Sequence, residues 1–333
     1  MELLIGKARQ PLFIALGGGG DVASASMLAL AARRLGLKAY VASVVWERFS
    51  IDPVPGPVRM SEIVNAKKIG DHAMFVTEES KALRGDRVVA FQAANASRAL
   101  GEPIGVVDIA SGYIGVRRGI EELTSYLGCD VVVGVDVGGD VLATGFEEEL
   151  WSPLADFIGL AAIKDLKGVL AVHAPGSDGE LTPRYILKRI ALVAAHGGYL
   201  GARGITPEDV ENLDKLLRHV ESEASRVTLM AARGAYGQVK IRRGSRKVQI
   251  TPLSTITFFL KPETVACLNP LISEVYNTTY VEEAREKLNR KGVYTELDLE
   301  EDVYQAIKEG REISGETLIE IKKNKIIKVL RRE

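Results

Sequence analysis

Short β-rich runs alternate with helical segments over the first half of this chain, and this alternation constrains the fold more than any other feature. The runs predicted as strands lie at residues 12–16, 39–46, 87–91, 104–109, 130–135 and 169–172. Helical patterns end at residues 34 and 100 and cover residues 120–127 and 154–166. Strands that alternate with helices form βαβ units, in which the strands are parallel. The sequence therefore predicts an α/β fold with a doubly wound, mostly parallel sheet.

The pattern changes near residue 180 to an appended C-terminal α+β region. Helices are predicted at residues 185–200 and 207–230, and Thr206 and Pro207 suit the N-cap and first position of the second one. Two hairpins and one strand are predicted after them, at residues 238–242 with 247–250, 256–260, and 318–321 with 326–330. We expect residues 1–180 to form the core that carries the site. Residues 181–333 then complete the fold or build the interface of a homo-oligomer.

Composition and charge exclude several classes of protein. The 333 residues are 46% hydrophobic, which is enough to bury a large core, and the formal net charge of −1 gives no overall attraction to nucleic acid or anionic membranes. The basic stretch at residues 240–247 is typical of a charged hairpin edge. The chain has two cysteines, no secretory signal and no long apolar run. We expect a cytoplasmic protein without a nucleic-acid or membrane partner.

Acidic residues collect where the predicted strands end. Ligands of open α/β sheets bind beyond the carboxyl ends of the strands, so side chains at these positions are candidates for a site. The strand-end candidates are Asp21, Glu47, Asp108, Asp136, Asp140 and His173, followed closely by Asp178 and Glu180. Asp136 and Asp140 flank a Gly-Gly turn after one buried strand, so their carboxylates should share one crevice. Two like charges that close favour a divalent cation such as Mn²⁺ or Mg²⁺ as their partner.

Each candidate also has a structural interpretation. Asp21 could cap a helix, Glu47 could pair with Arg48 on the surface, and Asp108 could cap a turn. Asp178 precedes a glycine and is typical of a turn, while a lone histidine such as His173 is more often a hydrogen-bonded structural residue than a base. The pair of Asp136 and Asp140 is the hardest to explain without a cation.

The glycine run Gly17, Gly18, Gly19 and Gly20 stands between the first strand and the first helix. With Ala23 it fits a dinucleotide-binding fingerprint, but the charge of Asp21 at the helix start would repel a pyrophosphate. A phosphate held through a metal ion reconciles the glycines with the surrounding acids. Arg48, just before the proline-rich stretch at residues 52–57, could bind an anionic group bidentately, with two of its three guanidinium nitrogens.

Taken together, these motifs resemble domain-of-unknown-function family 1152, which is largely archaeal. The similar stretches are residues 17–21, residues 47–48 with 52–57, and residues 136–140 with 152–156. The resemblance implies a Rossmann-like α/β core, an acidic metal-binding pocket and a manganese-dependent phosphatase activity. The metal-site role is carried over to Asp21, Glu47, Asp136 and Asp140.

The leading hypothesis is a metal-dependent hydrolase that acts on a small phosphate ester through a metal-activated water. Asp136, Asp140 and His173 are the predicted catalytic residues, with His173 or a carboxylate that binds no metal as the proton donor. Arg48 and the amides of residues 17–20 would bind the phosphate. Two alternatives stay open. One is a metal-dependent lyase or cyclase that acts on a small carboxylic acid, and the other is a protein that binds a nucleotide or metabolite without catalysis.

Overall fold

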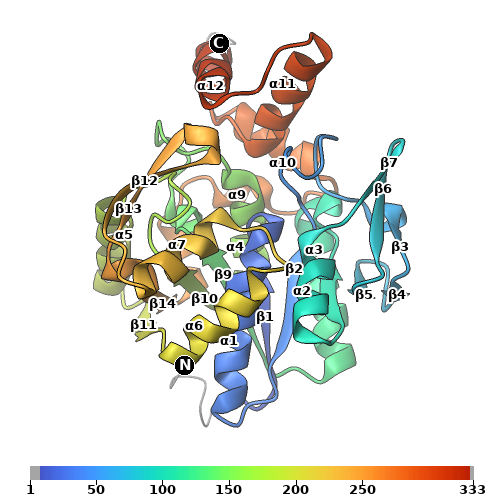
Figure 1. The fold of residues 1–333 in the computed structure, drawn as a ribbon, viewed down its shortest axis with the longest axis vertical. Coiled ribbons are helices and arrows are strands. Elements are labelled where there is room, and N and C mark those ends of the chain that lie inside the picture. The colour runs from blue at the N-terminus through green and yellow to red at the C-terminus, as the bar shows by residue number, and fades with distance from the viewer. Residues whose placement is uncertain (1–7, 331–333) are drawn as a thin grey trace.

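A nine-stranded sheet with helices on both faces forms the centre of the molecule (Figure 1). The computed structural model describes residues 8–330, with side chains up to residue 324. Five parallel strands occupy the middle of the sheet: β10 (Val169–His173), β9 (Val131–Val137), β1 (Pro11–Ala15), β2 (Tyr40–Val44) and β8 (Ile104–Val107). This confirms the predicted α/β fold, and the order of these strands is that of a Rossmann-like sheet.

The chain adds its parallel strands to the sheet on both sides of β1. The chain first builds β1, β2 and β8 towards one edge and then returns to place β9 and β10 on the other side of β1. The strand order therefore reverses between β1 and β9, where an open α/β sheet leaves a crevice beyond its carboxyl edge. The glycine run follows β1. Asp136 lies near the end of β9, and the turn that leads to Asp140 follows that strand.

Antiparallel strands extend the sheet at both edges. On one side these are β14 (Ile256–Leu260) and β11 (Tyr199–Gly204), and on the other β5 (Ala73–Val76) and β4 (Lys67–Lys68). Because β11 and β14 come from the second half of the chain, the C-terminal region completes the central sheet. The domain boundary near residue 180 falls between β10 and the next helix and stays a prediction.

Helices cover both faces of the sheet, and each face has its own hydrophobic core. One face is covered by α1 (Val22–Arg34), α2 (Gln92–Leu100), α6 (Pro207–Leu216) and α7 (Glu223–Ala232). The other is covered by α3 (Gly112–Leu127), α4 (Pro153–Asp165), α5 (Pro183–Ala195), α8 (Pro262–Cys267), α9 (Ile272–Val275) and α10 (Val281–Asn289). Successive residues of a strand point to opposite faces, so each strand contributes to both cores. Thr206 and Pro207 open α6 as predicted, and the Thr206 hydroxyl accepts a hydrogen bond from the amide of Asp209.

Smaller elements complete the fold. The predicted hairpin near residue 244 forms from β12 (Gly237–Ile241) and β13 (Arg246–Ile250). A separate three-stranded sheet contains β3 (Ile63–Val64), β6 (Lys81–Arg84) and β7 (Arg87–Val89). The strand predicted at residues 87–91 is therefore β7, outside the central sheet. Within residues 8–330, no helix is both long and apolar enough to cross a membrane.

The structure corrects three element predictions in the C-terminal half. The helix predicted at residues 185–200 ends at Ala195, because Gly197 takes a φ of 71° and the chain then enters β11. The helix predicted at 207–230 is divided into α6 and α7. The tail hairpin is wrong, since residues 315–330 form one helix, α12 (Gly315–Leu330). Leu318 and Ile321 are three residues apart, which places both on one helix face that packs against α11 (Glu296–Lys308). Figure 1 shows α11 and α12 at the top of the molecule.

Candidate functional site

Six carboxylates are buried together beyond the carboxyl ends of β1, β9 and β10. Each residue is 6% exposed or less: Asp21, Asp136, Asp140, Asp156, Asp178 and Glu180. Two groups within this acidic cluster have the spacing of cation ligands, because one oxygen from each member lies within 4.8 Å of the others. The first group is Asp136, Asp140 and Asp156, and the second is Asp140, Asp178 and Glu180. Asp140 belongs to both.

Local backbone geometry brings these acids together. Asp136 is the sixth residue of β9, and Gly138 and Gly139 follow at φ 126° and 103°, which L side chains rarely adopt. The chain therefore turns back at once and brings Asp140 opposite Asp136. A Cβ added to Gly138 would also collide with the carboxyl group of Asp178, so this glycine leaves room for the second group of ligands.

Several buried oxygens of the acidic cluster have no hydrogen-bond partner. They are Oδ2 of Asp136, Oδ1 of Asp156 and both side-chain oxygens of Asp178. A buried carboxylate without a partner costs several kcal/mol, and native proteins pair such groups with donors, cations or metals. The free oxygens belong to the same two groups that have metal-ligand spacing, so a cation would satisfy them.

Protonation is the alternative for these acids when no cation is present. Burial raises the pKa of Asp136 to about 7, although hydrogen bonds from the Asp140 side chain and nearby amides lower it. Burial and the neighbouring carboxylates raise the pKa values of Asp21, Asp140 and Asp156 well above the usual range. For Asp178, burial and Glu180 act in the same direction. The crevice therefore holds more carboxyl groups than can all be ionised together without a cation.

Glu180 is the member of the cluster that stays ionised. Burial alone would raise its pKa, but the Arg246 guanidinium and hydrogen bonds from Ser152 and the Trp151 amide lower it. Arg246 Nη1 lies 2.9 Å from Glu180 Oε1. The Ser152 hydroxyl also lies 3.3 Å from Asp140 Oδ2, so it connects Glu180 with the shared ligand. These contacts fix the orientation of the second group.

The glycine run makes room for carboxylates. A Cβ on Gly17 would lie 2.7 Å from Asp21 Oδ2, and one on Gly19 would collide with the carboxyl group of Glu47. One on Gly20 would lie 3.0 Å from the carbonyl oxygen of Glu221 in the loop before α7. The amide of Gly19 donates to the Trp46 carbonyl at 2.8 Å. The Gly19 amide is thus engaged within the protein, contrary to the expected phosphate-binding role.

The structure separates the predicted metal residues into two sets. Asp136 and Asp140 belong to the groups with ligand spacing, and Asp21 lies beside them with its carboxylate 3.4 Å from the amide of Val137. Glu47 belongs to neither group. It accepts a hydrogen bond of 2.9 Å from the Gln92 amide, and burial raises its pKa to about 7. Glu47 instead lines the adjacent cavity.

His173 does not meet the acidic cluster. In the sheet it is paired with Val137, whereas Val172 is paired with Asp136, so His173 and Asp136 point to opposite faces. Its ring nitrogens lie 2.8 Å from the Thr257 hydroxyl and 3.0 Å from the Thr228 hydroxyl. Burial lowers its pKa to about 4. Of its two interpretations, the structure supports the hydrogen-bonded structural residue. Asp108 likewise caps a turn, through Ser111.

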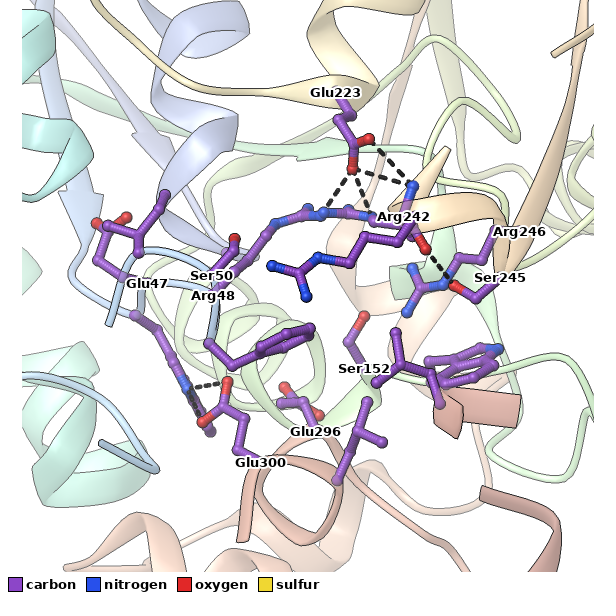
Figure 2. A pocket seen from close by; sticks show the side chains of 18 of the residues that line it. Glu47, Arg48, Ser50, Ser152, Glu223, Arg242, Ser245, Arg246, Glu296 and Glu300 are labelled. Carbon is purple, nitrogen blue, oxygen red and sulfur yellow. Dashed lines mark hydrogen bonds and ion pairs between the residues drawn. The ribbon is translucent and has the colours of Figure 1, made fainter. Parts of the chain in front are cut away.

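A cavity of about 330 Å³ opens beside the acidic cluster and contains Arg48 (Figure 2). Gly18 and Ser152 line it on the side of the cluster. Figure 2 shows Arg48 entering from one side and Arg242 and Arg246 from the other. Trp46, Phe49, Trp151, Leu299 and Leu318 supply the apolar part of its wall. The cavity therefore combines apolar surface with four arginines and five glutamates, and Arg246 connects it to the acidic cluster through Glu180.

Several residues of the site have weak sequence signals. Asp178 has the sequence signal of a turn residue, and Glu180 is signalled only by its place shortly after a predicted strand. Asp156 lies in the first turn of α4, and its sequence signal is its place in the stretch 152–156 that resembles the family, with no indication that it is a ligand. Arg242 and Arg246 were assigned to a solvated hairpin edge, but their side chains are only 12% and 9% exposed.

Comparison with protein families adds one finding. The model of a protein family of unknown function, DUF1152, matches residues 12–304, which include all six acids. The chain belongs to the DUF1152 family. No curated protein and no solved structure matches the chain. The resemblance seen in the motifs is thus confirmed for this DUF1152 protein, while its activity stays a prediction.

Proposed function

We propose that this DUF1152 protein is a divalent-metal-dependent hydrolase that cleaves a small phosphate ester. The observation that carries the proposal is the acidic cluster with its unpartnered buried oxygens, next to a cavity that contains arginines. Carboxylates arranged this way fit hard cations, and guanidinium groups fit the oxygens of a phosphate. The two features suit a substrate that bridges metal and arginine.

The donor set favours Mn²⁺ or Mg²⁺. All members of the two groups are carboxylates, whereas zinc and copper sites usually include histidine or cysteine. Asp136, Asp140 and Asp156 would hold one cation, and Asp140, Asp178 and Glu180 a second, with Asp140 bridging them. Cations at such positions polarise phosphoryl oxygens and lower the pKa of water, which is the chemistry that phosphate hydrolysis requires.

Arg48 and Arg246 would stabilise the charge of the phosphoryl group. The guanidinium of Arg246 reaches Glu180 at 2.9 Å, and Arg48 lies close enough to Asp21 and Glu180 for their charges to raise its pKa, although burial and Arg246 lower it overall. Both guanidinium groups therefore lie where the cavity meets the acidic cluster. Fixed positive charges that face a developing oxyanion are a large part of catalysis by many enzymes.

Glu47 is the best candidate to protonate the leaving group. It lines the cavity, belongs to neither group of ligands, and has a pKa of about 7 because it is buried. A general acid works best when its pKa is near the working pH. Glu47 thus takes the place of His173, which the structure puts on the other face of the sheet.

The proposal is tested by stripping the purified protein of metal, adding Mn²⁺, and measuring phosphate release from a panel of phosphate esters. We expect release only with the cation, and its loss in Asp136→Asn. Asp86→Asn is the matched control, because Asp86 is an exposed residue remote in sequence from the site. Absence of phosphate release from every ester, in protein shown to bind Mn²⁺, would contradict the hydrolase. Small carboxylic acids in the same panel test for the lyase.

A further inference from the structure

Four arginines line one cavity: Arg48, Arg242, Arg243 and Arg246. Five glutamates line it as well, and burial raises the pKa of three of them, Glu47, Glu296 and Glu300, to about 7 or 8. Arg48 and Arg246 lie next to the acidic cluster and are accounted for above. Arg242 and Arg243 belong instead to the turn between β12 and β13. Their described contacts are with Glu223, Phe49 and Ile313, which lie outside the cluster.

The hydrogen-bonding capacity of these guanidinium groups is incompletely used. Glu223 lies 3.6 Å from Arg242 Nε and 3.8 Å from Arg48 Nη1, too far for hydrogen bonds, and accepts one from the Arg242 amide at 3.0 Å (Figure 2). Nε of Arg242 and Nε of Arg246 are buried without a hydrogen-bond partner. One half-exposed glutamate, Glu223, therefore forms ion pairs with two arginines, and the cavity retains hydrogen-bond donors suited to an anion.

The backbone that carries Arg242 and Arg243 is strained. Both have a φ of 55°, and Gly244 follows at 85°. A left-handed conformation is unfavourable for a residue with a side chain, and hairpin turns of this kind favour asparagine and glycine. Strain of this kind concentrates at binding sites, where the surrounding fold maintains it. Here it coincides with two arginines that line a cavity.

Apolar side chains line the cavity together with these charges. Trp46 and Phe49 are among them, and the guanidinium of Arg243 lies 5.4 Å from the centre of the Phe49 ring. The volume of about 330 Å³ is at the lower end for sites that bind small ligands. None of the six acids lines the cavity, but Ser152 and Arg246 line it and contact Glu180. A ligand could therefore reach the edge of the cluster with one end and the turn with the other, with its carbon skeleton against the aromatic rings.

We propose that Arg242 and Arg243 bind a second phosphate group of the substrate. The preferred substrates are then small bisphosphorylated molecules, with one phosphate at the acidic cluster and the other at the β12–β13 turn. This inference rests on the proposed function, since that function assigns the first phosphate to the cluster.

The test compares fructose bisphosphate with fructose monophosphate in Mn²⁺-loaded protein. We expect kcat/KM to favour the bisphosphate, and R242Q/R243Q to reduce this preference about 10- to 100-fold, mostly through KM, because charged hydrogen bonds are lost. The matched control is K240Q/K247Q, which removes two positive charges from exposed positions of the same hairpin. The control should keep the full preference. Thermal unfolding verifies that each variant is folded.

Calorimetric binding of the same two sugars separates this inference from the proposed function. Tighter binding of the bisphosphate that R242Q/R243Q abolishes, in protein that releases phosphate from no ester of the panel, supports the second phosphate site and contradicts the hydrolase. Hydrolysis of both sugars with equal kcat/KM, or a preference that survives in R242Q/R243Q, overturns the second phosphate site alone. Preference for phosphoglycerate over glycerol phosphate, without one for the bisphosphate, also overturns it, because the second group would be a carboxylate.

Discussion

Asp140 is the residue on which the acidic cluster depends most. It belongs to both groups of ligands, and burial together with four acidic neighbours raises its pKa well above the usual range. Replacing it removes a ligand from each proposed cation and also relieves repulsion among the remaining acids. The replacement should therefore destabilise the metal-bound protein and stabilise the metal-free protein.

Asp140→Asn should abolish stabilisation by Mn²⁺. Wild-type protein should gain about 2.7 kcal/mol when the cation is present at 100 times its dissociation constant, whereas the variant should gain little. Without metal, the variant should unfold at a higher temperature than the wild type, because it carries one buried acid fewer. Thermal unfolding with and without Mn²⁺ measures both effects, with Asp86→Asn as control. Full Mn²⁺ stabilisation of D140N would exclude Asp140 as the shared ligand.

His173→Ala should affect stability and not the proton-donating step. The change leaves the hydroxyl groups of Thr228 and Thr257 without their ring partners, which costs about 1–3 kcal/mol. Denaturant unfolding measures this cost. The pH dependence of phosphate release should keep its shape, since Glu47 is the proposed acid, and E47Q should change that shape. Loss of the basic limb in H173A, with that limb retained in E47Q, would restore the catalytic role predicted from the sequence.

The sequence predicted Asp136 and Asp140 because a β-branched strand followed by glycines determines where both side chains lie. It could not predict the roles of Asp156, Asp178 and Glu180. Asp178 and Asp156 occupy a turn and a helix start, where acids are common for other reasons. Only the packing of α4 and the β10 loop against β9 shows that they converge.

At the scale of elements, α11 is attached to the site through two partly buried glutamates. Glu296 accepts hydrogen bonds from the amides of Leu154 and Ala155 at the start of α4, at 2.9 and 2.7 Å. Glu300 accepts from the Trp46 indole and the Gly56 amide, both at the cavity side. This helix therefore closes the cavity and caps the helix that carries Asp156.

Glu296→Ala should destabilise the protein by about 0.5–2 kcal/mol, because the first turn of α4 loses its cap. Denaturant unfolding measures the effect. Glu301→Ala, in the same helix, is the control, since Glu301 is exposed and its ion pair with Arg285 should contribute under about 1 kcal/mol. Equal losses in both variants would show that Glu296 does not act as the cap.

Element predictions succeeded where strands and helices alternate regularly and failed in the tail. The pattern of residues 318–330 was compatible with two strands around Asn324, yet the chain forms α12. Burial of Leu318 and Ile321 against α11 decides between the two, and that partner could not be inferred from the tail itself. The burial of Arg242 and Arg246 could likewise not be inferred from the hairpin itself, because the cavity that they line is built from segments distant in sequence.

At the scale of the whole molecule, metal binding should be coupled to pH. Without metal, burial raises the pKa of Asp136 from 3.8 to about 7, so the folded state retains a proton that the unfolded chain releases. This contribution to the free energy of unfolding is complete below pH 3.8 and is lost as the pH rises to about 7. A cation replaces the protons, so its affinity should increase with pH over the same range.

The increase in melting temperature caused by Mn²⁺ should therefore be larger at about pH 8 than at about pH 5. Thermal unfolding at both values, with metal and with a chelator, measures the difference. We expect Asp86→Asn to behave as the wild type does, since an exposed acid releases no buried proton. An equal increase at both values would mean that the cation binds acids that are already ionised, outside the acidic cluster.

The strand order of the whole sheet explains why the site lies where it does. The order reverses between β1 and β9, and Asp136 and Asp140, predicted from the sequence as strand-end candidates, lie at this point. The alternation of strands and helices was sufficient for the fold class. The strand predicted at residues 256–260 is β14, but its antiparallel place in the central sheet was not predicted, because this pairing is set by contacts distant in sequence.

Anomalous scattering from crystals grown with Mn²⁺ tests the central claim most directly. The account predicts strong peaks at the acidic cluster, one contacted by Asp136, Asp140 and Asp156 and one by Asp140, Asp178 and Glu180. Manganese bound elsewhere, with the six buried carboxylates making no contact to it, would contradict the account.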